Sequence, residues 1–161
     1  MSNKLPKTLK KSAILVQDSP IHGRGVFACK DIQKGECIIE YEGERISWKV
    51  AMKRHPHDPG QPNHTFYFSL TNGKVIDGKV KGNDARWINH SCAPNCIANE
   101  LQDKKDCLHV FLFAKKNIKA GDELFYDYSL DVEGKQTKAL KKDYRCRCGS
   151  KKCRGTMLSK N

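Results

Sequence analysis

The sequence predicts a mainly β domain built of small β-sheets, with little helix. Short runs of β-branched and aromatic residues recur along the 161 residues, and clusters of Gly, Pro, Asn and Asp separate them. Only one stretch, residues 48–55, has the length and composition of a helix. A chain of this length suits one domain with its own hydrophobic core.

The first third of the chain contains three short apolar runs, which predict strands at residues 13–17, 26–28 and 37–41. Two glycines in SPIHGRG make a turn between the first and second of these strands. Residues 42–47 are expected to turn out of the third. Ser47 is a candidate N-cap for the helix, which ends at Pro56, and the Pro-rich stretch that follows predicts an irregular loop.

The rest of the chain repeats the pattern of strands and turns. Asn72-Gly73 predicts a hairpin turn between strands at 64–70 and 73–78. Residues 81–96 predict a helical turn followed by irregular chain. Residues 108–118 contain a buried strand, and 119–130 predict a turn followed by a short strand. The domain boundaries expected from these patterns are a basic tail at 1–12, the β domain at 13–131, a mobile lysine-rich linker at 132–144, and a cysteine-rich tail at 145–161.

The formal net charge is +12, and much of it lies in the two tails. An excess of this size attracts a protein to anionic surfaces such as DNA, RNA or chromatin, although it also serves solubility. No apolar segment follows the basic start, and no apolar run is long enough to cross a bilayer. We therefore expect neither a secretory signal nor a membrane partner.

Eight cysteines are unevenly spaced, and three crowd into the C-terminal tail as C-x-C-x4-C, at Cys146, Cys148 and Cys153. This spacing predicts a local metal site, and zinc prefers four tetrahedral thiolate or imidazole ligands. The alternative is three ordinary free thiols. The spacing leaves the fourth ligand open among Cys92, Cys96, Cys107 and the histidines. Cys29, Cys37, Cys96 and Cys107 are otherwise interpreted as buried or half-buried small side chains.

The internal motifs are weak when taken one at a time. Asn89-His90-Ser91-Cys92 is compatible with a Cys/His metal site or with a nucleophile beside a base. Tyr126 and Tyr128 are equally compatible with core aromatics whose hydroxyls are hydrogen-bonded. The histidines at 55, 57, 64 and 109 indicate no site, and those at 55 and 57 are expected at the surface.

Taken together and in order, six segments resemble the SET-domain protein-lysine methyltransferases. They are IHGRGVFA at 21–28, IIEYEGERIS at 38–47, HTFYFSL at 64–70, GNDARWINHSCAPNC at 82–96, IKAGDELFYDYSL at 118–130 and CRCGSKKC at 146–153. The likeness covers about residues 13 to 156. It implies that NHSC and ELFYDY meet in a pseudoknot, and that the cysteine-rich tail is a post-SET element.

The resemblance also implies a cofactor, S-adenosylmethionine, and one structural zinc ion. By position in the family motifs, Cys92 becomes the fourth zinc ligand beside Cys146, Cys148 and Cys153. The cofactor-binding residues implied in the same way are His22, Gly23, Arg24, Gly25, Phe66, Asn89, His90 and Arg147.

Tyr128 matches the family's catalytic tyrosine, and the substrate-lysine channel is implied to contain Tyr41, Tyr126 and Phe66. Family members often have Tyr at Phe66, and Tyr67 cannot replace it because adjacent strand residues face opposite ways. Tyr126 occupies the position that influences how many methyl groups are added, and a hydroxyl there predicts mainly monomethylation.

The implied partner is a protein that carries a target lysine, such as a histone, a ribosomal protein or a bacterial DNA-packaging protein. Two alternatives are a non-catalytic SET module that binds chromatin or nucleic acid, and a zinc-ribbon-like nucleic-acid binder. The second leaves RWINHSC and GDELFYDY unexplained. We expect an intracellular location, with nucleus, cytoplasm and delivery into a host all open. No cysteine-rich module precedes residue 13.

Overall fold

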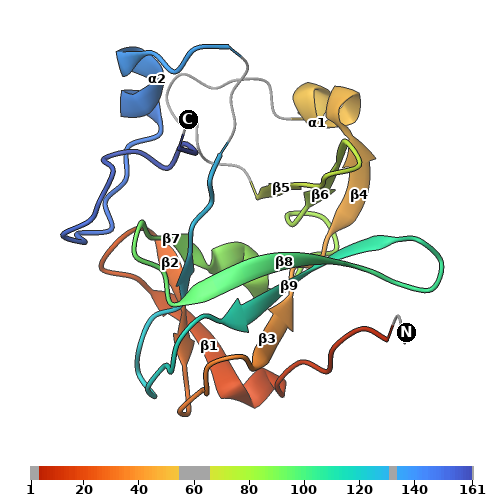
Figure 1. Ribbon diagram of the computed structural model, residues 1–161, viewed down its shortest axis with the longest axis vertical. Helices are drawn as coiled ribbons and strands as arrows, with labels where there is room; N and C mark the ends of the chain where they lie inside the picture. Colours follow the sequence, from red (N-terminus) through yellow and green to blue (C-terminus); the bar gives the residue numbers. More distant parts are fainter. Residues whose placement is uncertain (1–3, 55–65, 131–133, 161) are drawn as a thin grey trace.

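The computed structural model describes residues 4–54, 66–130 and 134–160, and within them the chain forms small β-sheets with short helices (Figure 1). The first sheet pairs β1 (Ile14–Asp18) with β2 (Arg24–Ala28). The helical segments are short and are η1 (Lys11–Ala13), α1 (Trp48–Arg54), η2 (Asp84–Trp87) and α2 (Lys138–Asp143). No helix in the described parts is long and apolar enough to cross a membrane.

Two three-stranded antiparallel sheets form most of the body. In one, β9 (Leu108–Ala114) lies between β3 (Cys37–Glu40) and β8 (Cys96–Gln102). In the other, β6 (Lys74–Asp77) lies between β4 (Glu44–Ser47) and β5 (Tyr67–Ser69). The mainly β fold class predicted from the sequence is therefore confirmed.

Helix α1 packs on the β4–β6–β5 sheet in the way that its sequence predicts. The Ser47 hydroxyl accepts a hydrogen bond from the Val50 N–H at 3.2 Å, which satisfies one of the free donors of the first turn. Ala51 faces inward and joins Ile46 and Val75 in a small apolar cluster. The loop predicted after the helix, with His55 and His57, lies outside the described residues, as does His64 at the start of the next predicted strand.

Three elements differ from the sequence prediction. Residues 44–47 form β4 rather than a turn, because they pair along their length with β6. Strand β8 was not predicted, because its sequence CIANELQ mixes apolar and polar residues without a regular alternation, and it lies at the edge of the sheet beside β9. Within the predicted linker, α2 forms with Thr137 as its N-cap, whose hydroxyl accepts from the Leu140 N–H at 3.1 Å.

The core gathers apolar side chains from nearly all strands. Its largest fully buried members include Val26, Ile32, Ile38, Val110, Leu112, Ile118 and Leu124. Cys37 and Cys96 are buried as expected, but Cys29 and Cys107 are exposed. The expectation for those two was wrong because both lie in turns, Cys29 just after β2 and Cys107 between β8 and β9.

His109 on β9 has a structural role that the sequence did not indicate. Its Nδ1 lies 2.6 Å from Glu40 Oε1 and its Nε2 lies 2.9 Å from Asp103 Oδ2. Burial lowers the pKa of His109, but the two carboxylates outweigh this effect and raise it above the ordinary value. The imidazole therefore links the β8–β9 hairpin to β3.

Candidate active site

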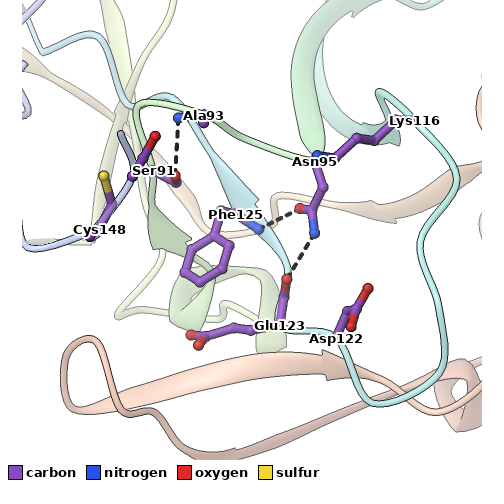
Figure 2. A pocket seen from close by; sticks show the side chains of 10 residues that line it. Ser91, Ala93, Asn95, Lys116, Asp122, Glu123, Phe125 and Cys148 are labelled. Carbon is purple, nitrogen blue, oxygen red and sulfur yellow. Dashed lines mark hydrogen bonds between the residues drawn. The ribbon is translucent and has the colours of Figure 1, made fainter. Parts of the chain in front are cut away.

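Two segments far apart in the sequence meet in a short parallel pair. Strand β7 (Asn89–His90) lies beside β10 (Phe125–Tyr126), with Asn89 opposite Phe125 and His90 opposite Tyr126. Figure 2 shows how Asn95 holds this junction, since its amide donates to the Glu123 carbonyl at 2.8 Å and accepts from the Phe125 N–H at 2.9 Å. The meeting of NHSC with ELFYDY is therefore confirmed.

Four aromatic side chains form a cluster next to this junction. Ring centroids are 4.7 Å apart for Tyr126 and Tyr128, 6.2 Å for Phe68 and Tyr126, and 5.4 Å for Tyr41 and Phe68. The Tyr41 hydroxyl donates to the Phe66 carbonyl at 2.7 Å, and the Tyr128 hydroxyl donates to the Ile88 carbonyl. The structure therefore brings together three of the predicted channel and catalytic residues and adds Phe68.

Burial is the main reason why the three tyrosine hydroxyls of this cluster hold their protons. It raises the pKa of Tyr41, Tyr126 and Tyr128 above the ordinary value of 10, and the neighbouring phenols raise those of Tyr41 and Tyr126 further. At neutral pH all three are hydrogen-bonding groups. None is a ready proton acceptor in the sense of a general base.

Phe66, which directly precedes β5, packs apart from Phe68, which belongs to that strand. Its ring contacts Trp87 edge-on, with centroids 5.1 Å apart. The guanidinium of Arg86 stands 5.0 Å from the Trp87 centroid, and that of Arg24 stands 5.7 Å from it. Sequence reasoning did not single out Phe68 or Trp87. No local signal identified either residue, because Phe68 contacts Tyr41 and Tyr126, and Trp87 contacts Phe66 and Arg24.

The HGRG turn is fastened to the same junction by Asn89. The Asn89 side-chain amide donates to the carbonyl oxygens of His22 and Arg24, at 3.1 and 3.0 Å, and to Glu123 Oε1 at 2.9 Å. Its nitrogen is therefore fully used within the protein. Any ligand contact of Asn89 is left to its Oδ1 or backbone.

Glycine is favoured at the two positions of this turn, Gly23 and Gly25, for different structural reasons. Gly23 has a φ of +48°, in the left-handed region, and no atom lies within 4 Å of where its Cβ would be. At Gly25 a Cβ would lie 2.1 Å from Glu123 Oε1, so a larger residue would force the Glu123 side chain to move. Gly23 therefore leaves open space in front of the turn, whereas Gly25 makes room for a carboxylate.

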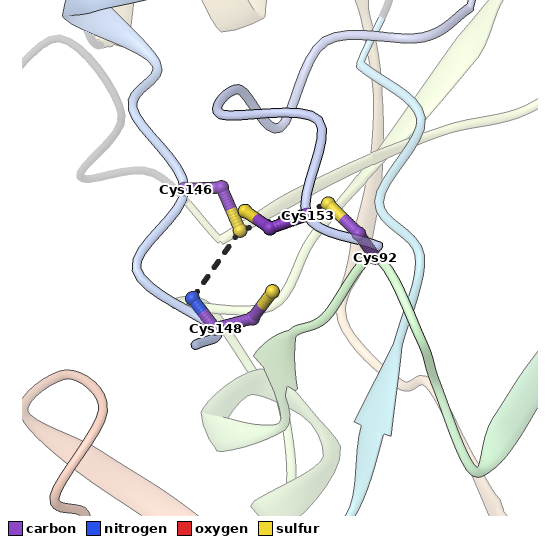
Figure 3. A group of neighbouring side chains, drawn as sticks. All are labelled: Cys92, Cys146, Cys148 and Cys153. Carbon is purple, nitrogen blue, oxygen red and sulfur yellow. Dashed lines mark hydrogen bonds between the residues drawn. The ribbon is translucent and has the colours of Figure 1, made fainter. Parts of the chain in front are cut away.

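The tail cysteines meet Cys92 in a compact cluster (Figure 3). The sulfur atoms of Cys92, Cys146, Cys148 and Cys153 all lie within 4.8 Å of one another, and the Cys92 and Cys146 sulfurs are 3.7 Å apart. Tetrahedral coordination with zinc–sulfur bonds of about 2.3 Å requires sulfur separations of about 3.8 Å. The four side chains therefore fit one zinc ion, and the fourth ligand that spacing left open is Cys92.

Backbone donors stabilise the thiolates of this cluster. The N–H groups of Cys148, Arg154 and Gly155 donate to the sulfurs of Cys146, Cys92 and Cys153, at 3.3 to 3.4 Å. Burial raises the pKa of Cys148, but hydrogen bonds from the cluster and the backbone bring it down to about 6. Arg147, between the first two tail ligands, is exposed.

The His90 side chain is buried beside the junction. The side chain is 2% exposed, and its Nδ1 accepts from the Tyr128 N–H at 3.0 Å. Burial lowers the pKa of His90 to about 4, which Asp127 opposes and Arg154 reinforces. The side chain is therefore a neutral structural group, and its ring packs edge-on against Tyr128 with centroids 5.3 Å apart.

Two open pockets flank the 123–129 segment. One, of about 380 Å³, is lined by Phe68, Asp127, Tyr128 and residues of the 94–98 segment, and so opens beside the aromatic cluster. The other, of about 370 Å³, lies between Glu123, Phe125 and the tail at 148–150 (Figure 2). Its lining includes neither Tyr128 nor the HGRG turn, so we assign it no role in the chemistry.

Residues 23–129 match the SET domain family. The chain belongs to the SET domain family. The histone-lysine N-methyltransferase trithorax of Drosophila virilis is 38% identical over 151 residues, which is 92% of this chain and 4% of trithorax. Human histone-lysine N-methyltransferase 2B is 37% identical over 148 residues, 92% of this chain and 5% of the human protein. This SET chain thus spans less than a tenth of these relatives.

A solved structure is similar to this SET domain as well. It is described as ctPRC2 in an autoinhibited conformation bound to S-adenosylmethionine. The match has a TM-score of 0.67 and 33% identity, and covers 73% of this chain and 15% of that one. The predicted SET fold is therefore confirmed by sequence family and by structure.

Proposed function

We propose that this SET domain transfers a methyl group from S-adenosylmethionine to the side-chain amine of a lysine in a protein. The observation that carries the proposal is the junction of β7 with β10, which places Tyr128 in an aromatic cluster beside the HGRG turn fastened by Asn89. The relatives named as histone-lysine N-methyltransferases and the solved structure bound to S-adenosylmethionine support it. A purely nucleic-acid-binding zinc module would need none of these features.

S-adenosylmethionine, when bound, supplies a methyl group on a positively charged sulfur. We assign its site to the open side of the HGRG turn, where Gly23 leaves space and where Phe66, Trp87 and Arg24 form one wall. Asn89 would contribute through its Oδ1 or backbone. The predicted contacts of His22, His90 and Arg147 stay predictions. Both ring nitrogens of His90 already contact protein groups, Tyr128 N–H and Cys92 Sγ, so a cofactor contact of this residue would be left to its backbone.

The acceptor amine would enter between Tyr41, Phe68, Tyr126 and Tyr128. An unperturbed lysine has a pKa of about 10.4, so most of it is protonated at neutral pH. A narrow aromatic channel beside a positive sulfur disfavours the ammonium form, and the proton leaves to solvent before attack. The nitrogen lone pair then forms the bond to the methyl carbon while the carbon–sulfur bond breaks and its electrons remain on sulfur.

Tyr128 is placed to align this displacement. Its hydroxyl hydrogen is committed to the Ile88 carbonyl, so the oxygen lone pairs are available to accept an N–H from the amine. Holding nucleophile, methyl and sulfur in line contributes several kcal/mol to such a reaction. Because the Tyr128 pKa is raised, this role needs no proton transfer to the tyrosine.

Isotope transfer tests the proposed function directly. The purified chain, loaded with zinc, is incubated with labelled S-adenosylmethionine and with histones or an extract of basic proteins. Label in a protein band supports the proposal if a peptide from that protein is also labelled and a version of the peptide without lysine is not. A chain that binds the donor but labels no protein would favour the non-catalytic alternative.

Product state is the finer part of the proposal, and it depends on Tyr126. This side chain is 7% exposed and lies in contact distance of both Tyr128 and Phe68, so its hydroxyl occupies space that a methylated amine would need. We expect mainly monomethylated lysine from the wild type and di- or trimethylated lysine from Tyr126→Phe. Mass spectrometry of product peptides measures this, and abundant trimethyllysine from the wild type would contradict it.

We propose chromatin as the setting, with a histone or another basic DNA-associated protein as substrate, and an intracellular location. Charge distribution favours an additional contact with nucleic acid. Residues 134–160 contain ten basic residues and one acidic residue, which gives +9 of the total +12. Residues 12–133, in contrast, contain sixteen basic and seventeen acidic residues and are close to neutral.

A salt titration tests the nucleic-acid contact. The logarithm of the association constant for duplex DNA should fall linearly with the logarithm of the salt concentration. Each phosphate contact contributes about 0.9 to the slope of this line, so replacing the exposed Lys138, Lys141 and Lys142 by Gln should make the slope shallower by about 2 to 3. Lys49→Gln with Lys53→Gln, exposed on α1, is the matched control. Equal slopes for both sets would mean that the tail is not the contact.

A further inference from the structure

His90 stands between the active-site tyrosine and the four-cysteine cluster. On one side its Nδ1 accepts from the backbone N–H of Tyr128 at 3.0 Å. On the other its Nε2 lies 3.4 Å from the sulfur of Cys92. The side chain is almost fully buried, so both contacts are shielded from water. One ring thus contacts both sites at once.

The contact with Tyr128 fixes which nitrogen of His90 carries the proton. A backbone N–H can only donate, so Nδ1 must present its lone pair. In the neutral ring the proton then sits on Nε2 and points at Cys92. A zinc-bound thiolate is an acceptor, and a hydrogen bond to it both lowers its charge density and orients it. The tautomer required at one end is therefore the one suited to the other.

A second, parallel link joins the same two sites. Arg154, which directly follows the ligand Cys153, makes a two-point ion pair with Asp127, at 2.8 and 3.0 Å. Its backbone N–H donates to Cys92 at 3.4 Å. Asp127 lies between Tyr126 and Tyr128 in the sequence. The cluster is thus connected to both flanks of the Tyr128 peptide group, by an imidazole and by a guanidinium.

We propose that His90 is a positioning residue that couples the four-cysteine zinc cluster to the catalytic tyrosine, rather than a side-chain contact of the cofactor. Loss of the metal would free Cys92, release Nε2 of His90 and loosen the Tyr128 backbone. The inference relies on the proposed function for the role of Tyr128. Its metal side stands independently of catalysis.

Two substitutions separate the two ends of the ring. His90→Asn retains an acceptor near Nδ1 but loses the donor to Cys92, and His90→Gln does the reverse. Removing such a supporting contact typically costs about 10- to 100-fold in metal affinity or activity. We expect a chelator to strip zinc from His90→Asn at least about 10-fold more readily than from the wild type, and from His90→Gln at nearly the wild-type rate.

Kinetics give the opposite ranking. With zinc saturating, kcat should fall about 10-fold or more in His90→Gln and less in His90→Asn, with KM for the donor nearly unchanged in both. A rise in donor KM with kcat preserved would instead make His90 a cofactor contact and overturn the proposal. So would equal zinc retention in both variants. His109→Asn, a histidine that pairs with Glu40 and Asp103, is the control and should alter neither readout.

A measurement on the wild type avoids dependence on the folding of variants. The nitrogen-15 resonances of the His90 ring should report a bare Nδ1 and a protonated Nε2 in the zinc-loaded protein, with a change when zinc is removed. The other tautomer, or a ring insensitive to zinc, would overturn the coupling. If the wild type transfers no methyl group, the proposed function fails, while chelation and resonance data still decide the link to the cluster.

Discussion

Tyr128→Phe is expected to lower kcat for methyl transfer by about 100-fold, with little change in the affinity for S-adenosylmethionine. The substitution removes the hydroxyl that is held by the Ile88 carbonyl and that would accept from the incoming amine. Misplacement of reacting groups by about 1 Å can cost about 100-fold in rate, because alignment is worth so much in a two-body displacement. Single-turnover transfer of labelled methyl groups to a peptide measures the effect.

The matched control for this substitution is Tyr67→Phe. Tyr67 also donates a hydrogen bond to a backbone carbonyl, that of Ala51 at 3.0 Å, but it does so on the α1 side of the β4–β6–β5 sheet. Loss of that bond should cost about 1 kcal/mol of stability and leave the rate of transfer unchanged. If both variants lost rate equally, the effect would be one of stability, and Tyr128 would have no special place in the reaction.

Cys148→Ser should abolish the binding of one zinc ion per chain and release the cysteine-rich tail from the body of the domain. Structural zinc contributes on the order of 10 kcal/mol in small zinc-binding peptides, and a serine hydroxyl is a poor substitute for a thiolate. Because the body has its own core, we expect local rather than global unfolding. Zinc content by atomic emission and protease cleavage within 134–160 measure the two parts of the prediction.

Cys107→Ser provides the comparison, because Cys107 is exposed in the β8–β9 turn and is not a member of the cluster. It should retain one zinc ion and a protected tail. Chelation of the wild type should reproduce the behaviour of Cys148→Ser. A chelated wild type with an intact tail would show that packing and the Asp127–Arg154 ion pair suffice without metal.

Local patterns predicted the elements that depend on local physics. The Asn72-Gly73 hairpin and the capped helix after Ser47 were found where expected, because turn chemistry and capping act over a few residues. β4 and β8 were missed because their pairing partners supply the order and their own sequences carry little period-two signal. The short helix α2 was missed because a lysine-rich sequence resembles a linker until a cap at Thr137 fixes it.

The residues of the candidate site likewise fall into those that the sequence predicted and those that it did not. Motif resemblance named Tyr128, Asn89 and the HGRG turn, and the structure brings them together. Spacing alone left Cys92 as one of several candidate ligands, since nothing local to residues 146–153 identifies a partner 54 residues away. Phe68, Trp87 and Asn95 were missed because each acts through contacts with distant segments, which composition does not reveal.

The β7–β10 pair has a consequence for how the chain reaches its native state. The ladder between these two strands has two residue pairs, Asn89 with Phe125 and His90 with Tyr126, and the tail closes over Cys92 beside it. Bringing together segments that are distant in the sequence costs loop-closure entropy before the contact contributes any favourable energy, and this slows folding. Because this ladder is so short and the neighbouring Cys92 is held by the tail, we expect it to become fixed after the larger sheets, so that newly made chains acquire a competent centre only after metal has arrived.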